Sequence, residues 1–224
     1  MRALRKALRY LLVAGLALLV LLAGLILLWR AVPPVSTLML VRLVTFRGVE
    51  RTYVPLSRIS PKLIAAVITS EDAQFCRHHG VDWGALNEVI NEADEDGPSR
   101  GASTITMQTA KNLFLWPQRS TIRKALEIPL ALVLDRVWGK KRVLEVYLNI
   151  AEWGPGVFGA EAGSRRYFHK SAADLSQREA SLLATALPNP LLRDPSRPKR
   201  RHAVLAAINA GRVVGAEGYL ECVR

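Results

Sequence analysis

Glu71 and Asp72 are adjacent carboxylates in a short segment that also holds Phe75, His78 and His79. If the segment is one helix, Glu71, Phe75 and His78 share a face, because they are spaced i, i+4 and i+7. A carboxylate beside an aromatic ring near a helix end is partly desolvated, which raises its pKa and suits it to act as a base or acid near neutral pH. An amphipathic helix in which Glu71 forms a cap or a salt bridge explains the same spacing. The two histidines do not have metal-ligand spacing.

Residues 101–127 hold a second group of polar side chains, in which hydroxyls and amides are followed by cations and a second carboxylate, Glu127. Arg binds phosphate oxygens bidentately and Lys acts as a point charge, so this density of cations suits a pyrophosphate headgroup attached to a lipid. Glu127 lies four residues after Arg123 and three after Lys124, so the three share a helix face; ordinary ion pairs along a helix account for this spacing equally well. The other polar residues are Ser103, Thr104, Thr106, Gln108, Lys111, Asn112 and Arg119.

The elements that position these groups begin with an apolar run of 19 residues at 11–29, which is long enough to span the roughly 30 Å core of a bilayer. A cleavable signal peptide is the alternative, but its apolar region usually has about 7–15 residues and ends at a small-residue site, which the following WRAVPPV does not offer. We therefore expect an uncleaved transmembrane helix at 11–29 after a basic tail at 1–10. Four cations precede the run and only Arg30 follows it closely, which places the N-terminus in the cytoplasm and the rest of the chain outside.

The charge of the outer part of the chain predicts anionic partners. Of the 31 Lys and Arg residues, 26 lie after residue 30 together with all 19 acidic residues, which leaves a net charge of +7. Lipid headgroups or phosphorylated substrates fit this charge, and nucleic acid is not expected outside the membrane. Lys199, Arg200 and Arg201 either extend the cationic substrate site or face anionic lipid.

The two cysteines, Cys76 and Cys222, follow no ligand spacing and predict neither a zinc site nor a disulfide framework. An exported compartment would allow them to pair. We expect instead that Cys76 serves as a small buried apolar residue.

The remaining patterns predict a mainly α domain after the membrane helix. Residues 30–58, with two prolines and the apolar stretch LMLVRLVTF, predict a linker and one strand. Ser60 and Pro61 are typical first residues of a helix, which should stop at Gly80. Another helix should begin at Ser120 or Thr121, and Pro129 inside it predicts a kink or two abutting helices. Further helices are expected at 140–153 and 175–187.

Taken together and in order, these segments resemble the peptidoglycan glycosyltransferases of glycosyltransferase family 51. Five motifs of that family fall between Glu71 and Ala180, over about 110 residues. The first two are E-D-x-x-F-x-x-H-x-G at 71–80 and G-x-S-T-I-T-Q-Q-x-x-K-N at 101–112, where Met107 replaces the first Gln. The others are R-K-x-x-E at 123–127, K-x-x-x-L-E-x-Y-L-N at 140–149, and Y-F-x-K with a downstream L-x-x-x-E-A at 167–180.

The resemblance implies a lysozyme-like, mainly α glycosyltransferase domain at 59–224 with a small membrane-proximal lobe, and an enzyme that polymerises lipid II into glycan strands. Glu71 and Glu127 are then the catalytic residues, with Glu71 as general base for the acceptor 4-hydroxyl, inversion at the donor and release of a polyprenyl diphosphate. Glu127 would orient the cations or hold a divalent cation, Mg or Mn, on the pyrophosphate. The expected substrate-binding residues are Asp72, Ser103, Thr104, Gln108, Lys111, Asn112, Arg119, Arg123 and Lys124.

The same resemblance places the protein in the bacterial cytoplasmic (inner) membrane, with its catalytic domain on the periplasmic side. Its expected partners are lipid II, the lipid-linked glycan chain, membrane lipids and other cell wall synthesis proteins, including transpeptidases, because we expect no transpeptidase activity in a chain of this length. Two rival functions are a lysozyme-like hydrolase and a non-catalytic protein that binds anionic headgroups. The cations at 111–124 argue against the hydrolase, because cleaving glycan expels no phosphate, and the second rival has no need of Glu71.

Overall fold

The computed structural model describes residues 2–91, 102–118, 120–216, 218 and 220–223. The chain divides into two compact units, residues 1–33 and 34–224. The first unit contains α1 (Arg2–Trp29), which includes an 18-residue window of mean hydropathy 3.1 and is long and apolar enough to cross a membrane. The predicted membrane helix at 11–29 therefore lies inside a longer helix that also takes in the basic tail.

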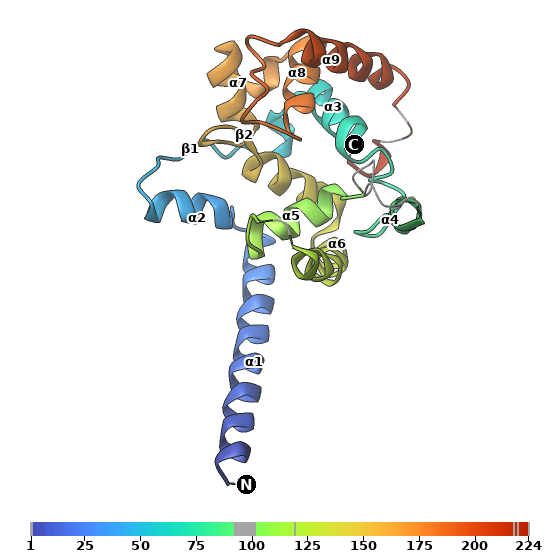
Figure 1. Cartoon of the computed structure of the whole chain (residues 1–224). Helices are drawn as coiled ribbons and strands as arrows, with labels where there is room; N and C mark the ends of the chain where they lie inside the picture. The colour runs from blue at the N-terminus through green and yellow to red at the C-terminus, as the bar shows by residue number, and fades with distance from the viewer. Residues whose placement is uncertain (1, 92–101, 119, 217, 219, 224) are drawn as a thin grey trace. The chain divides into compact units, whose positions relative to one another are not determined.

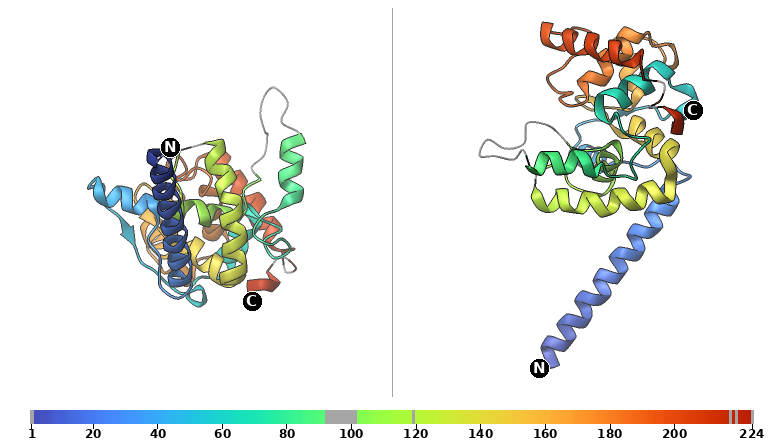
Figure 2. Two further views of the ribbon diagram at one scale, coloured as in Figure 1. Left: turned by 90° about the horizontal axis from the view of Figure 1, so that it is seen from below. Right: turned by 90° about the vertical axis from the view of Figure 1, so that its right-hand side faces the viewer.

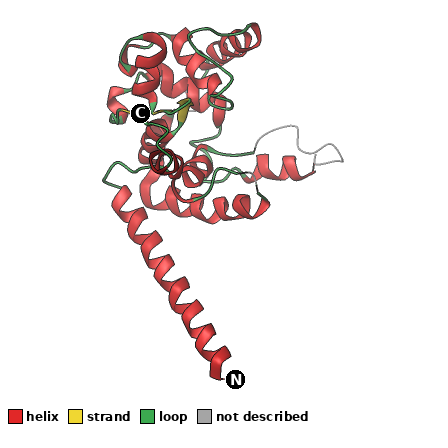
Figure 3. Ribbon diagram, turned by 60° about the vertical axis from the view of Figure 1, so that its left-hand side comes forward, coloured by secondary structure: helices red, strands yellow, loops and turns green. Residues whose placement is uncertain are grey.

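The second unit is mainly helical, as predicted, and its strands are short (Figure 1, Figure 3). The strands β1 (Glu50–Arg51), β3 (Val157–Phe158) and β2 (Glu152–Gly154) form one sheet in that order. In this sheet β1 runs parallel to β3, and β2 runs antiparallel to it. The helices are α2 (Thr37–Val44), α3 (Pro61–Glu71), α4 (Trp83–Asn91), α5 (Ile105–Phe114), α6 (Thr121–Ile150), α7 (Ala160–Phe168), α8 (Gln177–Ala186) and α9 (Arg200–Val213), with short 3₁₀ turns η1 (Leu56–Arg58), η2 (Ala172–Asp174) and η4 (Glu221–Val223).

Two groups of helices build the second unit. In one group α3 packs against α8 and α9, and in the other α5 packs against α6 (Figure 1). Both groups bury apolar side chains completely, for example Leu63 of α3, Ile105 of α5 and Leu183 of α8. Burial of such side chains supplies the main favourable free energy of folding, about 1.5–3 kcal/mol for each large one. The two groups meet where α3 ends and α5 begins.

The helix α3 begins where the sequence predicts and ends earlier. The Ser60 hydroxyl accepts a hydrogen bond from the Lys62 N–H, and Pro61 occupies the first turn. The helix ends at Glu71, because Asp72 leaves the helical conformation and the chain then turns until Gly80, whose φ is +83°. The prediction that helix α3 continues to Gly80 is therefore wrong, and Glu71, Phe75 and His78 do not share a helix face.

A helix, α2, occupies the stretch where the sequence pattern predicts a strand. An apolar run of this length fits either structure, and Ser36 decides it, because its hydroxyl caps α2 by accepting from the Met39 N–H. The chain after α2 is bound to the end of α6: the Asn149 side chain bonds both the N–H and the carbonyl of Val54, at 2.9 Å each. The segment 34–58 therefore belongs to the second unit.

The long helix α6 changes direction at Gly139 and not at Pro129. Gly139 has φ 70° and ψ 167°, whereas the helix continues through Pro129. Glycine adopts positive φ without the steric cost that a Cβ would add, so the chain turns there and the two parts of α6 point in different directions (Figure 2). The kink or junction that the sequence analysis expects at Pro129 is therefore wrong, whereas the separate helix that it expects from residue 140 begins directly after the turn at Gly139.

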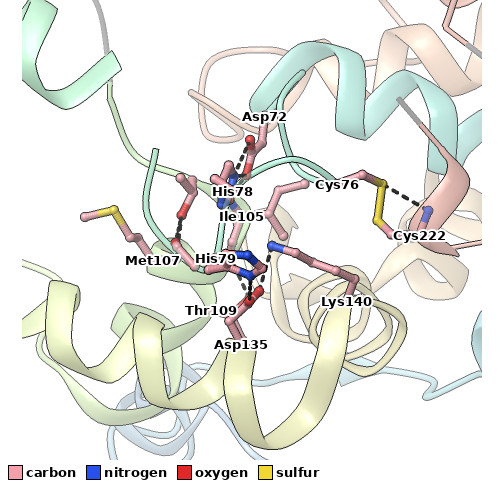
Figure 4. Close-up of polar contacts among 12 residues, drawn as sticks. Asp72, Cys76, His78, His79, Ile105, Met107, Thr109, Asp135, Lys140 and Cys222 are labelled. Carbon is pink, nitrogen blue, oxygen red and sulfur yellow. Dashed lines mark hydrogen bonds and ion pairs between the residues drawn. A yellow bond between two sulfur atoms is a disulfide. The ribbon is translucent and has the colours of Figure 1, made fainter. Parts of the chain in front are cut away.

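Cys76 and Cys222 form a disulfide, which corrects the expectation that Cys76 serves only as a small buried apolar residue. The bond joins the turn after α3 to η4 near the end of the described chain (Figure 4). The two residues are 146 positions apart in the sequence, and no local pattern brings them together. Tertiary packing alone places their Cα atoms 5.4 Å apart, within the range that a disulfide bridges.

Candidate active site

Glu71 is the last residue of α3, and its carboxylate points to α5. One oxygen, Oε2, accepts a hydrogen bond from the Gln108 side-chain amide at 3.0 Å, and the other, Oε1, is buried without a hydrogen-bond partner. Burial raises the pKa of Glu71 above its usual value. The Gln108 hydrogen bond and the charges of Lys111 and Arg193 oppose this rise, while Asp72 adds to it. A buried carboxylate with one free oxygen and a raised pKa is suited to accept a proton.

Asp72 holds the turn that follows Glu71. Its two carboxylate oxygens lie 2.9 and 3.0 Å from Nε2 of His78, and one of them accepts the Ile105 N–H at 2.9 Å (Figure 4). Asp72 is 8% exposed, so the carboxylate is committed to protein partners. Asp72 and His78 therefore stabilise the end of α3 and the turn after it by hydrogen bonds. The expectation that Asp72 binds substrate stays a prediction.

The same turn is also held against α6. The Phe75 ring is fully buried, and the Lys140 ammonium lies 4.6 Å from its centre. Lys140 also forms an ion pair with Asp135 at 2.7 Å, on the other side of the Gly139 junction (Figure 4). A cation over an aromatic ring is attracted by the negative face of the ring. The bend in α6 therefore places the ion pair between Lys140 and Asp135 next to Phe75, in the turn that follows Glu71.

The helix α5 presents different side chains to the active site and to the core. Thr104 is buried and caps α5: its hydroxyl accepts from the Met107 N–H at 3.1 Å and donates to the Gly80 carbonyl at 2.6 Å. Met107 is fully buried in an apolar cluster with Val81 and Ala131. Packing therefore explains the apolar residue at position 107. The family motif has Gln at this position, and in this chain a core side chain takes its place.

The cations at the start of α6 form a hydrogen-bonded group around Glu127. Arg123 and Lys124 both pair with the Glu127 carboxylate, Lys124 at 3.4 Å, so the predicted shared face is confirmed. Lys124 also donates to the Ser103 hydroxyl at 2.6 Å. Glu127 is 2% exposed and Arg123 8%, whereas the Lys124 side chain is about a third exposed. The group is thus buried at Arg123 and Glu127 and partly exposed at Lys124.

The pKa of Lys111, on α5, is influenced by both carboxylates of the site, Glu71 and Glu127. Burial lowers the pKa of Lys111, and Glu127 is the charged neighbour that opposes this shift most strongly. Arg123 and Lys124 lower the pKa further, whereas Glu71 raises it. The charge of the Lys111 ammonium is therefore influenced by both Glu71 and Glu127, which lie 56 positions apart in the sequence.

The other predicted site residues and the predicted metal have different outcomes. Asn112 is half-buried, and its carbonyl accepts the Thr37 hydroxyl at 3.1 Å. Arg119 lies outside the described residues.

Within the described part of the chain, no three His, Cys, Asp or Glu residues gather as metal ligands, and both Glu127 oxygens already face cations. The donor set around Glu127 therefore does not fit a metal held by the protein.

Two residues beside Glu71 have no role in the sequence analysis. Tyr147, on the second part of α6, donates its hydroxyl hydrogen to the Gln108 side-chain oxygen at 3.0 Å. Arg193, in the segment after α8, interacts electrostatically with Glu71 and donates to the Thr185 carbonyl at 2.6 Å. Tyr147 lies inside the fourth motif, which gives a signal for it. No local pattern points to Arg193, because only the packing of α8 against α3 brings it near the base.

Comparison with known proteins identifies the family of this chain. The family model described as "Transglycosylase" matches residues 39–210. The chain is similar to the "Biosynthetic peptidoglycan transglycosylase" of Brucella suis biovar 1 (strain 1330), with 54% identity over 193 residues and 86% of each chain covered. It is also similar to the proteins of that name from Rhodospirillum centenum (strain ATCC 51521 / SW), with 49% identity over 94% of this chain and 92% of the relative, and from Rhizobium meliloti (strain 1021), with 47% identity over 99% and 94%. A match over most of the chain, with relatives near 50% identity along nearly their whole length, shows that the chain belongs to the transglycosylase family.

Proposed function

We propose that this chain is a peptidoglycan glycosyltransferase that polymerises lipid II into glycan strands for the cell wall, with Glu71 as its general base. The observation that carries the proposal is a carboxylate, Glu71, that has one buried oxygen without a hydrogen-bond partner, together with the group of cations around Glu127. A transfer that expels a pyrophosphate needs a base for the incoming hydroxyl and cations for the departing phosphates. The relatives named biosynthetic peptidoglycan transglycosylases support the same reaction.

In the reaction, Glu71 removes the proton from the 4-hydroxyl of the acceptor sugar of lipid II. The oxygen forms a bond to the anomeric carbon of the lipid-linked glycan chain, with inversion, and the bond from that carbon to the pyrophosphate breaks. The proton ends on Glu71, and the electron pair leaves with the polyprenyl diphosphate. Oε1 of Glu71 is the oxygen that takes the proton, because Oε2 is held by Gln108. Positioned bases of this kind contribute about 10²–10⁴-fold to rate.

The leaving pyrophosphate is stabilised by the cations on α5 and α6. The Lys124 side chain, about a third exposed, supplies a donor at the open side of the site, and Lys111 adds a second positive charge near Glu127. Arg123 is held in place by Glu127 and by the Gln118 carbonyl, which accepts from its Nε at 2.8 Å. Donors that are already oriented stabilise the charge that develops on the leaving group without a cost of reorganisation. No step is assigned to a metal ion. The proposed substrate-binding set also includes Asp72, Ser103, Thr104, Gln108, Asn112 and Arg119.

The membrane location of the substrate fits two features of the chain. The helix α1 is suited to anchor the protein, and the cations before its apolar run favour a cytoplasmic N-terminus, with the catalytic unit on the periplasmic side. The second unit also exposes apolar side chains on and after α2, namely Leu40, Val41, Leu43, Val44 and Phe46, the last 96% exposed. Exposed apolar residues of this kind mark a surface that contacts lipid or protein. Lipids and transpeptidases remain the proposed further partners.

The proposal is tested by incubating the purified full chain with labelled lipid II and comparing Glu71→Gln with the wild type. Glu88→Gln is the matched control, because Glu88 is an exposed carboxylate on α4. We expect glycan polymer from the wild type and from Glu88→Gln, and a loss of at least about 100-fold for Glu71→Gln. Equal polymerisation by Glu71→Gln would remove Glu71 from its role. Shortening of preformed glycan, with no polymer made, would favour the hydrolase, and binding without turnover would favour the headgroup-binding protein.

A further inference from the structure

A chain of two hydrogen bonds runs from α6 through α5 to the proposed base. Tyr147 donates to Oε1 of Gln108 at 3.0 Å, and Nε2 of Gln108 donates to Oε2 of Glu71 at 3.0 Å. Tyr147 is 1% exposed, so its hydroxyl does not reach the substrate. The reaction described above uses Glu71 and leaves the role of this tyrosine open.

The hydroxyl determines which end of the Gln108 amide faces Glu71. An amide side chain carries an acceptor oxygen and a donor nitrogen, and a rotation of 180° exchanges them. Burial, together with the charges of Glu71 and Asp72, raises the pKa of Tyr147 well above its usual value, so the phenol keeps its proton and can donate. Its donated hydrogen holds the amide oxygen on the α6 side. The NH₂ group must then face the carboxylate, where the oxygen would be repelled.

We propose that Tyr147 is a positioning residue, which orients the Gln108 amide so that this amide occupies one oxygen of Glu71 and leaves the other free for the acceptor proton. The inference rests on the proposed role of Glu71 as general base. Without the tyrosine hydroxyl, the Gln108 amide is free to rotate, and in the rotated state it offers Glu71 an oxygen in place of a donor. The carboxylate then loses a hydrogen bond that favours its ionised form.

The other charged groups that face Glu71 stay in place when the hydroxyl is removed. They are Asp72 at the end of α3, Lys111 on α5 and Arg193 after α8. Tyr147 is the group that approaches from α6. A change in the pH dependence of turnover on loss of the hydroxyl is therefore assigned to the Gln108 amide, because the neighbouring charges are the same.

The test compares Tyr147→Phe with the wild type in the labelled lipid II assay, with kcat and KM measured from about pH 5 to 9 on the full chain. We expect kcat at neutral pH to fall about 2- to 10-fold, which corresponds to the loss of one neutral hydrogen bond, with KM unchanged. We also expect the acid limb of the kcat profile to move to higher pH, because Glu71 is harder to ionise. Tyr53→Phe is the matched control: it removes a hydroxyl that donates to Glu145 at 2.8 Å and should leave the acid limb in place.

A double-mutant cycle separates positioning from a general packing effect. Gln108→Met removes the amide, so it should move the acid limb at least as far as Tyr147→Phe does. Adding Tyr147→Phe to Gln108→Met should change nothing further, because residues that act through one another are not additive. A wild-type acid limb in Gln108→Met, or equal and additive shifts from the two changes, would overturn the inference even if Tyr147→Phe folded poorly.

The outcome for Glu71 itself is kept separate. If Glu71→Gln polymerises lipid II as well as the wild type, the general-base role of Glu71 fails and the role of Tyr147 fails with it, although the chain is still a polymerase. If Glu71→Gln is inactive while Tyr147→Phe and Gln108→Met keep the wild-type pH profile, the general base stands and only the positioning role is refuted.

Discussion

Breaking the disulfide between Cys76 and Cys222 should destabilise the second unit and loosen the turn that carries the base. Cys76 lies four residues after Asp72 and next to the buried Phe75, and its partner lies in η4. The bond closes a loop between positions 146 apart. An unfolded chain that keeps this bond has fewer conformations, so opening it returns entropy to the unfolded state and favours unfolding.

The size of the effect follows from the length of the loop. For about 146 residues the chain-entropy expression gives about 5 kcal/mol, and native disulfides usually contribute about 2–5 kcal/mol when they are removed. A domain of this size loses roughly 2–4 °C in Tm for each kcal/mol. We therefore expect reduction, or Cys222→Ser, to lower Tm by roughly 4–20 °C.

The measurement is thermal unfolding of the full chain in detergent micelles, followed by circular dichroism, with and without a reductant. Cys222→Ser should match the reduced wild type and should not respond to the reductant, which makes it the internal control. Lipid II turnover should fall in parallel if the turn is loosened before the unit unfolds. The same Tm for oxidised and reduced wild type, or two free thiols in the mass of the unreduced protein, would refute the reasoning.

Two further predictions concern the carboxylates of the site. Glu127→Ala leaves the buried Arg123 without its partner and should lower the free energy of unfolding by about 3–5 kcal/mol, measured by urea denaturation; an unchanged midpoint would show that the pair contributes nothing. For Glu71, the folded-state pKa is raised above the unfolded value of about 4.3, so the stability gained by protonation is present below about pH 4.3 and is lost as pH rises through the folded pKa. Glu71→Gln should therefore melt at a higher temperature than the wild type at pH 8 and at nearly the same temperature at pH 4, whereas equal Tm at pH 8 would contradict the burial argument.

Local sequence patterns predicted the helices of this protein better than its turns. The Ser60 and Pro61 start of α3 and the Ser120 start of α6 are confirmed, because a cap is a contact between residues two or three positions apart. The end of α3 was missed, because Asp72 there takes its partners from His78 and from the backbone of α5, 33 residues away. The kink expected at Pro129 is absent, since Pro129 stays helical within the packed α5–α6 pair, and the chain turns at Gly139, just before the helix that the sequence predicts from residue 140.

The amino-acid sequence by itself determined the long apolar N-terminal helix, the mainly α fold and the residue types of the site, since each depends on composition or on spacing along one element. Tertiary structure alone decided which of these residues meet. Gln108 bonds to Glu71, and Cys76 meets Cys222, because packed helices bring distant positions together. The same packing buried Met107 in the core and set Tyr147 behind Gln108. Burial and hydrogen-bond partners from other elements determine the protonation and the orientation of a side chain. The residues next to it in the sequence do not predict which partners it will have.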